Sequence, residues 1–339
     1  MSGGPSKIYI CHINHEHDRV FSENVIEYLN SRAVATKAIQ LANRGTRQEL
    51  QECLDYPEAA ALSFNAALDH SWLEAGSFME IAERRGLPVI QWILDHPCAR
   101  WAEFDASTAA NSRFLLNSEQ QRSYFETYCL PGALTATTGG VGPNWRSRID
   151  RLTPEDFSQR PWRCLVPLNL HRVRSMEENE AAMAALEPKQ AAAVRDAVGD
   201  ARYDMTGSLH RHVIRAVIDK GAVAPEMLNR LCQLVEESVQ TWRRLKIFAV
   251  AKGFPVLIQA DESAARFVRG SVAWFSTGVG MRATLERIPM CRAVLSVTPM
   301  NDMIHDRTMN AVNAGCVAIA EDNAANRALF THGENALGE

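Results

Sequence analysis

The stretch KIYICHINHEHDRVFSENVIEYL, residues 7–29, predicts how the fold begins. Residues 7–11 form a short apolar run rich in residues that favour β-strands. Four apolar residues then recur at the spacing of one helix face: Val20, Val25, Ile26 and Leu29. The polar residues between these two patterns therefore form the loop after a first strand. In an open α/β sheet such loops border the ligand crevice, so this loop is well placed for chemistry.

The loop motif HINHEHD, which begins at His12, has three interpretations. A zinc site would use His15 and His17 with His12 or Asp18. A helix cap would use Asp18 or Asn14 to accept hydrogen bonds from the first turn. A catalytic loop would use a histidine paired with a carboxylate, which is a suitable base near neutral pH. We favour a role in a binding cleft, with His15, His17 or Asp18 as the base.

The composition favours a soluble two-domain enzyme. A chain of 339 residues is too long for one typical core. Hydrophobic residues make up 46% of it and charged residues 22%. No apolar run approaches the roughly 20 residues of a membrane helix, and the first residues, MSGGPSK, lack the apolar core of a signal peptide. We therefore expect a cytoplasmic protein without a transmembrane segment.

Charge and cysteine content exclude two further classes. The formal net charge is −4, and the basic residues are scattered except for arginine pairs at 84–85 and 243–244, which we expect on helix surfaces. Because a nucleic-acid-binding domain normally has a basic stripe, we expect no nucleic-acid partner. The eight cysteines include no CxxC pair and most lie in apolar segments. They predict buried thiols in a reducing compartment.

Strands and helices alternate over residues 1–150, the first predicted domain. We predict strands at 7–11, 35–40, 60–63, 87–94, 113–116 and 133–137, and helices at 19–32, 46–54, 71–85 and 118–127. This alternation is typical of a parallel sheet with helices on both faces. The fold class is therefore α/β, with a Rossmann-like first half.

A second Rossmann-like domain is predicted at 151–339. Residues 139–163 are rich in glycine, proline and charge, as in a linker, and contain no GxGxxG pattern. Further strands are predicted at 163–170, 255–259, 272–275, 293–297 and 316–320. Residues 176–245 have an almost continuous helical pattern, which we interpret as a helical insert. Two α/β domains joined by a linker are the predicted architecture.

The strongest group of chemical residues lies near the C-terminus. The strand at 293–297 leads into a loop that holds Asn301, Asp302, His305, Asp306 and Arg307. A helix is then predicted to begin near Thr308. Its unpaired N–H groups, the positive end of its dipole and the Arg307 guanidinium together suit a diphosphate. Alternatively, Arg307 only holds the loop through a salt bridge to Asp302 or Asp306.

The segment HDRTMNAVNAGCVAIAEDN, residues 305–323, resembles the donor-binding strand, loop and helix of glycosyltransferases with the GT-B fold. It is more similar to the bacterial spore-maturation (CgeB-like) branch, in which a His-x-Arg precedes the helix and an acidic loop follows the last strand. The segment LPVIQWILDHPCARW, residues 87–101, is similar to the first domain of that branch, where a strand ends in Asp-His-Pro or Asp-Asp-Pro. The resemblance covers these two motifs and the two-domain layout.

The resemblance implies a nucleotide-sugar donor in the second domain. His305, Arg307 and Thr308 would adjoin its diphosphate, and Asn310 stands where the commoner pattern has a glutamate for the ribose. Glu321, Asp322 and Asn323 would face the sugar. The loop that begins with Ser276 and Thr277 would contact the base. The pocket would be closed by residues after the strand at 163–170, namely Asn169, His171 and Arg172.

The resemblance also implies that the two domains face each other across a cleft. Asp95 and His96 in the first domain would then look toward the donor, together with the loop that contains His15, His17 and Asp18. Alternatively, Asp95-His-Pro is only a turn, since proline restricts the residue before it and aspartate accepts local backbone hydrogen bonds.

We therefore expect a glycosyltransferase that moves a sugar from a nucleotide-sugar to an acceptor hydroxyl. No Asp-x-Asp triplet is present, so we expect neither a metal nor another cofactor. The acceptor is open: a protein, a glycan or a lipid. Two alternatives are a non-catalytic protein that binds a small anion or nucleotide, and a nucleotide-sugar epimerase on the same fold.

Overall fold

The structure is a computed structural model that describes residues 5–13, 15–41, 46–101, 104, 111–138, 152–168, 175–204, 209–218, 224–264, 271–277, 280–297 and 303–330. The chain divides into two compact units, Met1–Gly139 and Gly140–Glu339. In the described ranges no helix has both the length and the apolar character needed to span a bilayer. All eight cysteines are free thiols and six are buried, as predicted.

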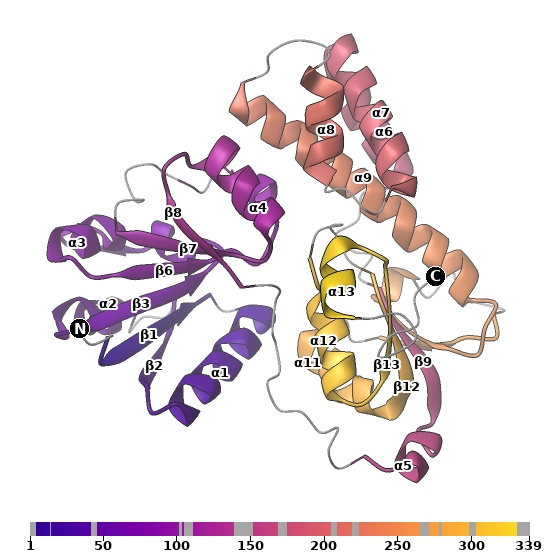
Figure 1. Cartoon of the computed structure of the whole chain (residues 1–339), viewed down its shortest axis with the longest axis horizontal. Helices are drawn as coiled ribbons and strands as arrows, with labels where there is room; N and C mark the ends of the chain where they lie inside the picture. The colour runs from indigo at the N-terminus through magenta and orange to yellow at the C-terminus, as the bar shows by residue number, and fades with distance from the viewer. Residues whose placement is uncertain are drawn as a thin grey trace. The chain divides into compact units, whose positions relative to one another are not determined.

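The first unit is built on a six-stranded parallel sheet in the order β2-β1-β3-β6-β7-β8 (Figure 1). Its strands are β1 Lys7–His12, β2 Ala35–Gln40, β3 Ala59–Phe64, β6 Val89–Trp92, β7 Ser112–Leu116 and β8 Leu134–Thr137. Its helices are α1 Glu16–Ser31, α2 Thr46–Asp55, α3 Phe78–Arg85 and α4 Glu119–Tyr124. All six residues of β3 are buried, because helices cover both faces of the sheet at this central strand.

One predicted helix of this unit begins later than expected. Residues 72–77 form a small hairpin, β4 Trp72–Leu73 and β5 Gly76–Ser77, where we predicted the first turns of a helix over 71–85. Gly76 has a φ of 129°, a backbone conformation that favours glycine and that does not occur in an α-helix. The helix predicted over 71–85 therefore cannot include Gly76. Helix α3 then begins after Ser77, which forms a capping box with Glu80.

The second unit has a five-stranded parallel sheet in the order β11-β10-β9-β12-β13. Its strands are β9 Trp162–Pro167, β10 Leu257–Gln259, β11 Trp274–Ser276, β12 Cys291–Ser296 and β13 Val317–Ala320. Short helices accompany it: α5 Pro154–Ser158, α11 Met281–Arg287, α12 Asp306–Asn313 and α13 Ala324–Leu329. The predicted parallel α/β architecture is confirmed in both units.

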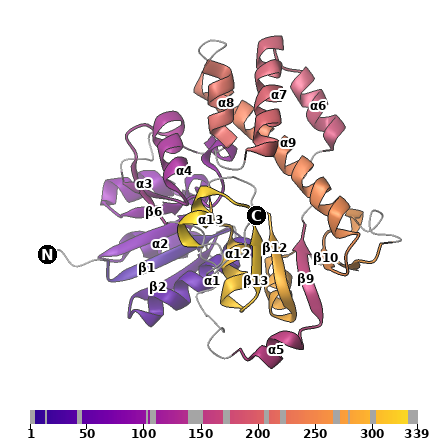
Figure 2. The same ribbon diagram turned by 45° about the vertical axis from the view of Figure 1, so that its right-hand side comes forward.

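Four helices connect β9 to β10: α6 Met176–Ala184, α7 Pro188–Tyr203, α8 Leu209–Ile218 and α9 Pro225–Ala251. At 27 residues, α9 is roughly 40 Å long, and it runs from the other three helices to the sheet (Figure 1, Figure 2). Its end packs Phe248 and Ala251 into a core with Val166 and Ile258. The last part of α9 is thus the crossover helix between β9 and β10, and the extra helices enter at the carboxyl end of β9.

The strand order of each sheet reverses at one point. In the first sheet the chain passes from β1 to β2 on one side and continues to β3 on the other side. In the second sheet the corresponding point lies between β9 and β12. Loops that leave neighbouring carboxyl ends in opposite directions open a crevice, which is where ligands bind in open α/β sheets. Side chains at these two edges are therefore placed to contact a ligand.

Two glycines with left-handed backbone should differ in their tolerance of a side chain. Gly86 and Gly315 both have a φ of 68°, but an added Cβ has free space at Gly86 and lies 2.5 Å from Leu152 Cδ2 at Gly315. We expect Gly86→Ala to reduce the free energy of unfolding by about 1–2 kcal/mol, the cost of the backbone conformation alone. Gly315→Ala should cost slightly more than Gly86→Ala, because the Leu152 side chain must also move aside. Urea unfolding of both variants measures the difference, and equal losses would contradict the crowding.

Candidate functional sites

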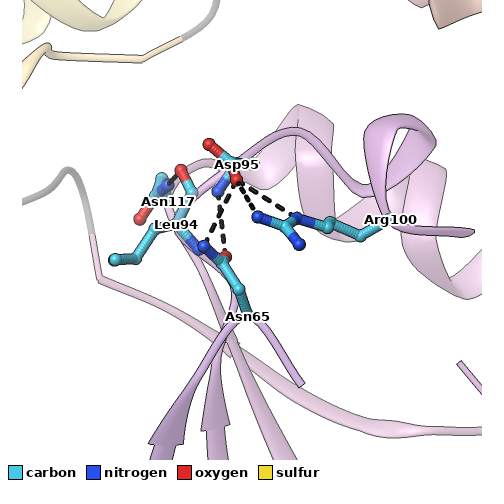
Figure 3. A network of polar contacts seen from close by, with 5 residues as sticks. All are labelled: Asn65, Leu94, Asp95, Arg100 and Asn117. Atoms are coloured by element: carbon cyan, nitrogen blue, oxygen red, sulfur yellow. Dashed lines mark hydrogen bonds and ion pairs between the residues drawn. The ribbon is translucent and has the colours of Figure 1, made fainter. Parts of the chain in front are cut away.

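The carboxyl edge of the first sheet carries a hydrogen-bonded polar network (Figure 3). Asn65 directly follows β3 and has a left-handed backbone, with a φ of 49°. Its Oδ1 accepts hydrogen bonds from the backbone N–H groups of Leu94 at 2.8 Å and Asp95 at 3.3 Å. From β7, Asn117 Nδ2 donates to the Leu94 carbonyl at 2.8 Å. Two asparagines that the sequence analysis did not select therefore fix the turn after β6.

This network orients Asp95. One carboxylate oxygen, Oδ2, accepts from Asn65 Nδ2 at 3.2 Å and from Arg100 Nε and Nη2 at 3.2 and 3.0 Å. The other oxygen points away from these donors (Figure 3). The Asp95 side chain is 49% exposed. Asp95 is therefore an accessible carboxylate with a fixed orientation, as a general base or a hydroxyl-binding group requires.

The residues of the HINHEHD loop adjoin this edge. His15 is the N-cap residue of α1, although its side chain makes no capping hydrogen bond, and its ring stacks on that of His17 at 5.3 Å. Asp18 lies at the third helical position and is buried. Burial raises its pKa above the ordinary value, the charges of His15 and Arg100 oppose that rise, and Asp95 adds to it. The structure thus brings His15, Asp18 and Asp95 into one electrostatic group.

His96 is not presented to solvent. It is 3% exposed, its Nδ1 accepts from the Cys98 N–H at 3.2 Å, and its ring packs 5.0 Å from that of Tyr124. These contacts fit the interpretation of Asp95-His-Pro as a structured turn. Throughout the described ranges, no three His, Cys, Asp or Glu side chains are placed to hold a metal ion.

In the second unit, helix α12 begins at Asp306, two residues before the predicted start. His305 is its N-cap residue, and its Nδ1 accepts from the Arg307 N–H at 3.1 Å. Thr308 is fully buried and its hydroxyl donates to Ser296 Oγ on β12 at 2.9 Å. Because α12 starts earlier than predicted, His305 is its N-cap residue and not a loop residue. The Thr308 hydrogen bond attaches α12 to β12.

Two arginines from distant segments, Arg244 on α9 and Arg307 in the first turn of α12, interact electrostatically. Burial, together with the charge of Arg307, lowers the pKa of Arg244 on α9 to about 10, and the charge of Glu236 opposes this shift. The pKa of Arg307 is lowered by burial too, against the opposing charges of Asp306 and Glu321. Burial also lowers the pKa of His305, so its imidazole is neutral near pH 7. These two guanidinium groups therefore lie within electrostatic range of one another.

Arg243 and Arg244 were expected on a helix surface, and for Arg243 this prediction is wrong. Arg243 is 5% exposed, and its Nη2 donates to the Ala201 carbonyl of α7 at 3.1 Å. The sequence does contain a signal for this burial. Three residues at successive spacings of four, Leu231, Val235 and Val239, are fully buried, and Arg243 is the next in that series. A charge in a core-facing series indicates a partner or a ligand.

The remaining predicted donor-site residues lie at the carboxyl edge of the second sheet in different settings. Asn310 is 4% exposed, and among the described residues its Oδ1 has no hydrogen-bond partner. Asn323 is fully buried: its Oδ1 accepts from the Asn326 N–H at 2.7 Å and its Nδ2 donates to the Met303 carbonyl at 3.1 Å. Asp322 forms an ion pair with Arg327. Asn323 thus caps α13, while Asn310 presents a buried acceptor.

Ser276 ends β11, with Thr277 directly after it, on the same edge but three strands away from β12. At the usual strand spacing this is roughly 14 Å, so only an elongated ligand reaches both Thr277 and Arg307. Asn169, His171 and Arg172 lie outside the described residues.

No protein-family model matches the chain, and no curated protein matches it. Among solved structures the chain is similar to Anabaena Alr3699/HepE in complex with UDP, with 10% identity and a TM-score of 0.47 over 98% of this chain and 85% of that one. It is also similar to the same protein in complex with UDP and glucose, at the same identity and TM-score, over 97% and 85%. At these values the similarity assigns no residue role and no activity to this chain.

The raised pKa of Asp18 predicts how stability changes with pH. The folded state binds this proton more tightly than the unfolded state, so stability falls as pH rises above the ordinary pKa of 3.8. The Asp18→Asn variant has no ionisable group at this position, so its stability does not fall with pH for this reason. We expect its melting temperature to equal that of the wild type below pH 3.8 and to exceed it increasingly toward neutral pH.

Asp55 provides a control, because its pKa is shifted in the opposite direction to that of Asp18. Hydrogen bonds from Gln51 and Arg85 lower its pKa, so its contribution is present at neutral pH and is lost as pH falls through the lowered value. Asp55→Asn should therefore reduce the melting temperature slightly at neutral pH. An Asp18→Asn variant that is less stable than the wild type at neutral pH would contradict the assignment.

Proposed function

We propose that this protein is a glycosyltransferase whose nucleotide-sugar donor binds with its diphosphate between Arg307 and Arg244. The observation that carries the proposal is the electrostatic interaction between these two partly buried guanidinium groups, one of which lies in the first turn of α12. The place is the carboxyl edge of β12, beside the reversal of strand order, where open α/β sheets bind ligands.

A bound anion would account for the presence of two partly buried arginines near the start of α12 better than the neighbouring protein groups do. Two half-buried arginines in electrostatic range repel each other, and burial opposes both charges. Asp306 and Glu321 beside Arg307, and Glu236 beside Arg244, offset part of this cost. A diphosphate would offset more, because it accepts charge-assisted hydrogen bonds from both guanidinium groups and interacts favourably with the positive end of α12.

The spread of candidate residues along the edge favours an elongated ligand. Thr277 lies roughly 14 Å from the strand that leads to Arg307, too far for one phosphate ion. A nucleoside diphosphate can extend over such a distance, with its base toward β11 and its diphosphate at α12. The resemblance of residues 305–323 to the spore-maturation branch of GT-B glycosyltransferases supports the same orientation.

The chemistry of transfer follows from these charges. The bond between the sugar and the diphosphate breaks with negative charge developing on the leaving diphosphate. Arg307, Arg244 and the first N–H groups of α12 would stabilise that charge. One such electrostatic donor is worth about 3–4 kcal/mol in a transition state. In this scheme protein cations serve the leaving group, so we propose that transfer does not require a metal.

The acceptor hydroxyl also needs a base, and we propose Asp95, at the carboxyl edge of the first sheet. Among the five predicted catalytic residues, Asp18 and His96 are buried, whereas Asp95 is about half-exposed and has one oxygen fixed by three donors. His15 is the next candidate, because it lies in the same electrostatic group.

Nucleotide binding tests the donor site. Titration calorimetry with UDP, GDP, CMP and dTDP should identify one preferred nucleotide. Arg307→Ala and Arg244→Ala should each weaken its affinity about 10- to 100-fold, the effect of losing one charge-assisted hydrogen bond. The matched control is Arg230→Ala, an exposed arginine on the same helix as Arg244 but roughly 20 Å away, which should bind normally. Unchanged affinity in both site variants would contradict the proposed donor site.

Product formation tests the base. With the preferred nucleotide-sugar and a panel of mono- and oligosaccharide acceptors, Asp95→Asn should lower kcat about 100- to 10,000-fold, as expected for loss of a general base. Nucleotide affinity should stay within about two-fold, since Asp95 does not bind the donor in this proposal. Asp55→Asn, on α2 of the same unit, is the control and should be fully active. Loss of activity in His15→Gln but not in Asp95→Asn would assign the base to His15 instead.

Release of nucleotide also separates the two alternative functions. A transferase should release nucleotide rapidly only when an acceptor is present. An epimerase should convert the sugar without an acceptor, and a binding protein should leave the nucleotide-sugar unchanged.

A further inference from the structure

Arg160 lies in the segment that precedes β9, which the sequence analysis treated as a linker. Its side chain is nevertheless buried in the second unit, with 7% of the residue exposed. Its Nη1 donates to the carbonyls of Cys291 at 2.7 Å and Gly315 at 3.2 Å and lies 3.0 Å from Cys316 Sγ. Its Nη2 donates to the Ala314 carbonyl at 2.8 Å. One guanidinium group therefore joins the beginning of β12 to the end of α12.

These contacts place a cation at the C-terminal end of the helix whose other end carries His305 and Arg307. Ala314 is the C-cap residue of α12, and its carbonyl and that of Gly315 belong to the terminal groups that a helix leaves unpaired. A cation there interacts favourably with the helix dipole. Leu152, from the same preceding segment, packs on Gly315, so that a Cβ there would displace the end of the Leu152 side chain.

Helix α12 is short enough for its two ends to move together. It has eight residues, which is roughly 12 Å. Near its start it is attached to β12 by the Thr308–Ser296 hydrogen bond, and at its end it is held by Arg160. Without the second attachment the helix can pivot about the first, and a pivot displaces the first turn.

We infer that Arg160 is a positioning residue for the anion site: through the C-terminal carbonyls of α12 it sets the placement of His305 and Arg307. This inference rests on the proposed function for its effect on nucleotide binding, but not for its effect on α12 itself. Lysine cannot replace Arg160, because a single ammonium group lacks the planar fork that reaches carbonyls of both β12 and α12.

The test uses full-length Arg160→Lys and two readouts. The first needs no ligand: the pH titration of the His305 ring by NMR, assigned with His305→Gln. Burial and the charges of Arg307 and Arg244 lower the His305 pKa in the wild type, while Asp306 opposes them. A displaced first turn loosens this environment, so the titration midpoint should rise by about 0.2–0.7 pH unit. The second readout is affinity for the preferred nucleoside diphosphate, which should fall about 10-fold.

Arg292 provides a matched control. It lies on β12, and its Nη2 donates to the Ser158 carbonyl of the same preceding segment, on α5 and not on α12. Arg292→Lys should leave both the His305 titration and the nucleotide affinity unchanged, although it also loosens the segment. Gly315→Ala acts on the end of α12 from the Leu152 side, and it should change both readouts in the direction of Arg160→Lys. It keeps the test decisive if Arg160→Lys does not fold.

The outcomes separate the two proposals. A His305 shift in Arg160→Lys and none in Arg292→Lys supports the positioning role, even if the wild type binds no nucleotide and the proposed function fails. Nucleotide binding by the wild type with an unchanged His305 titration in folded Arg160→Lys overturns the inference and leaves the proposed function intact. Equal changes in Arg160→Lys and Arg292→Lys would show only general loosening of the segment and would also overturn it.

Discussion

Parallel strand pairing is the constraint on which both candidate sites depend. Because every described strand of the two large sheets runs in one direction within its sheet, the loops that follow the strands emerge at the same edge. The reversal of strand order then separates two of these loops and leaves room for a ligand. Residues far apart in sequence meet as a result: Asn65 holds Asp95 at one edge, and Arg244 approaches Arg307 at the other. Neither of these interactions follows from local structure. Each one joins residues that are far apart in the sequence and that only the tertiary fold brings together.

Both edges also hold charged groups in surroundings that oppose their charge. Asp18 is a buried carboxylate whose ionised form burial disfavours, and Arg244 and Arg307 are buried enough for their guanidinium pKa values to fall. A fold selected only for stability would replace such groups with apolar residues, because burying an incompletely compensated charge costs free energy. Their grouping at the two places where α/β sheets bind ligands is typical of functional sites. The compensation differs in kind: Arg100 neutralises Asp95 and Asn65 donates a hydrogen bond to it, whereas Asp306 and Glu321 support the charge of Arg307 and Glu236 supports that of Arg244.

The sequence predicted what depends on neighbouring residues and missed what depends on tertiary contacts. Alternating apolar and helical patterns predicted most strands, and the residues around His305 and Arg307 marked a helix start. The hairpin at 72–77 was missed, because two-residue strands and a Gly76 φ of 129° leave little trace in periodicity. Asn65 was missed because its left-handed backbone is set by contacts with a turn 30 residues away. Arg244 was missed for a different reason: its helix was treated as an insert, and only the packing of α9 on the second sheet brings it to α12.

Helix α9 gives the helical segment a direct route to the anion site. Its last turns belong to the core beneath the second sheet, with Phe248 packed against Val166 and Ile258. One turn earlier, Arg243 bonds to the end of α7 while Arg244 faces α12. Because Arg243 bonds to α7, the turn of α9 that carries Arg244 is held against the helical segment as well as against the sheet. The position of one of the two guanidinium groups is thereby coupled to the helical segment, and that of the other, Arg307, to α12 and its own C-terminal contacts. The two halves of the proposed diphosphate site are thus supported by separate parts of the second unit.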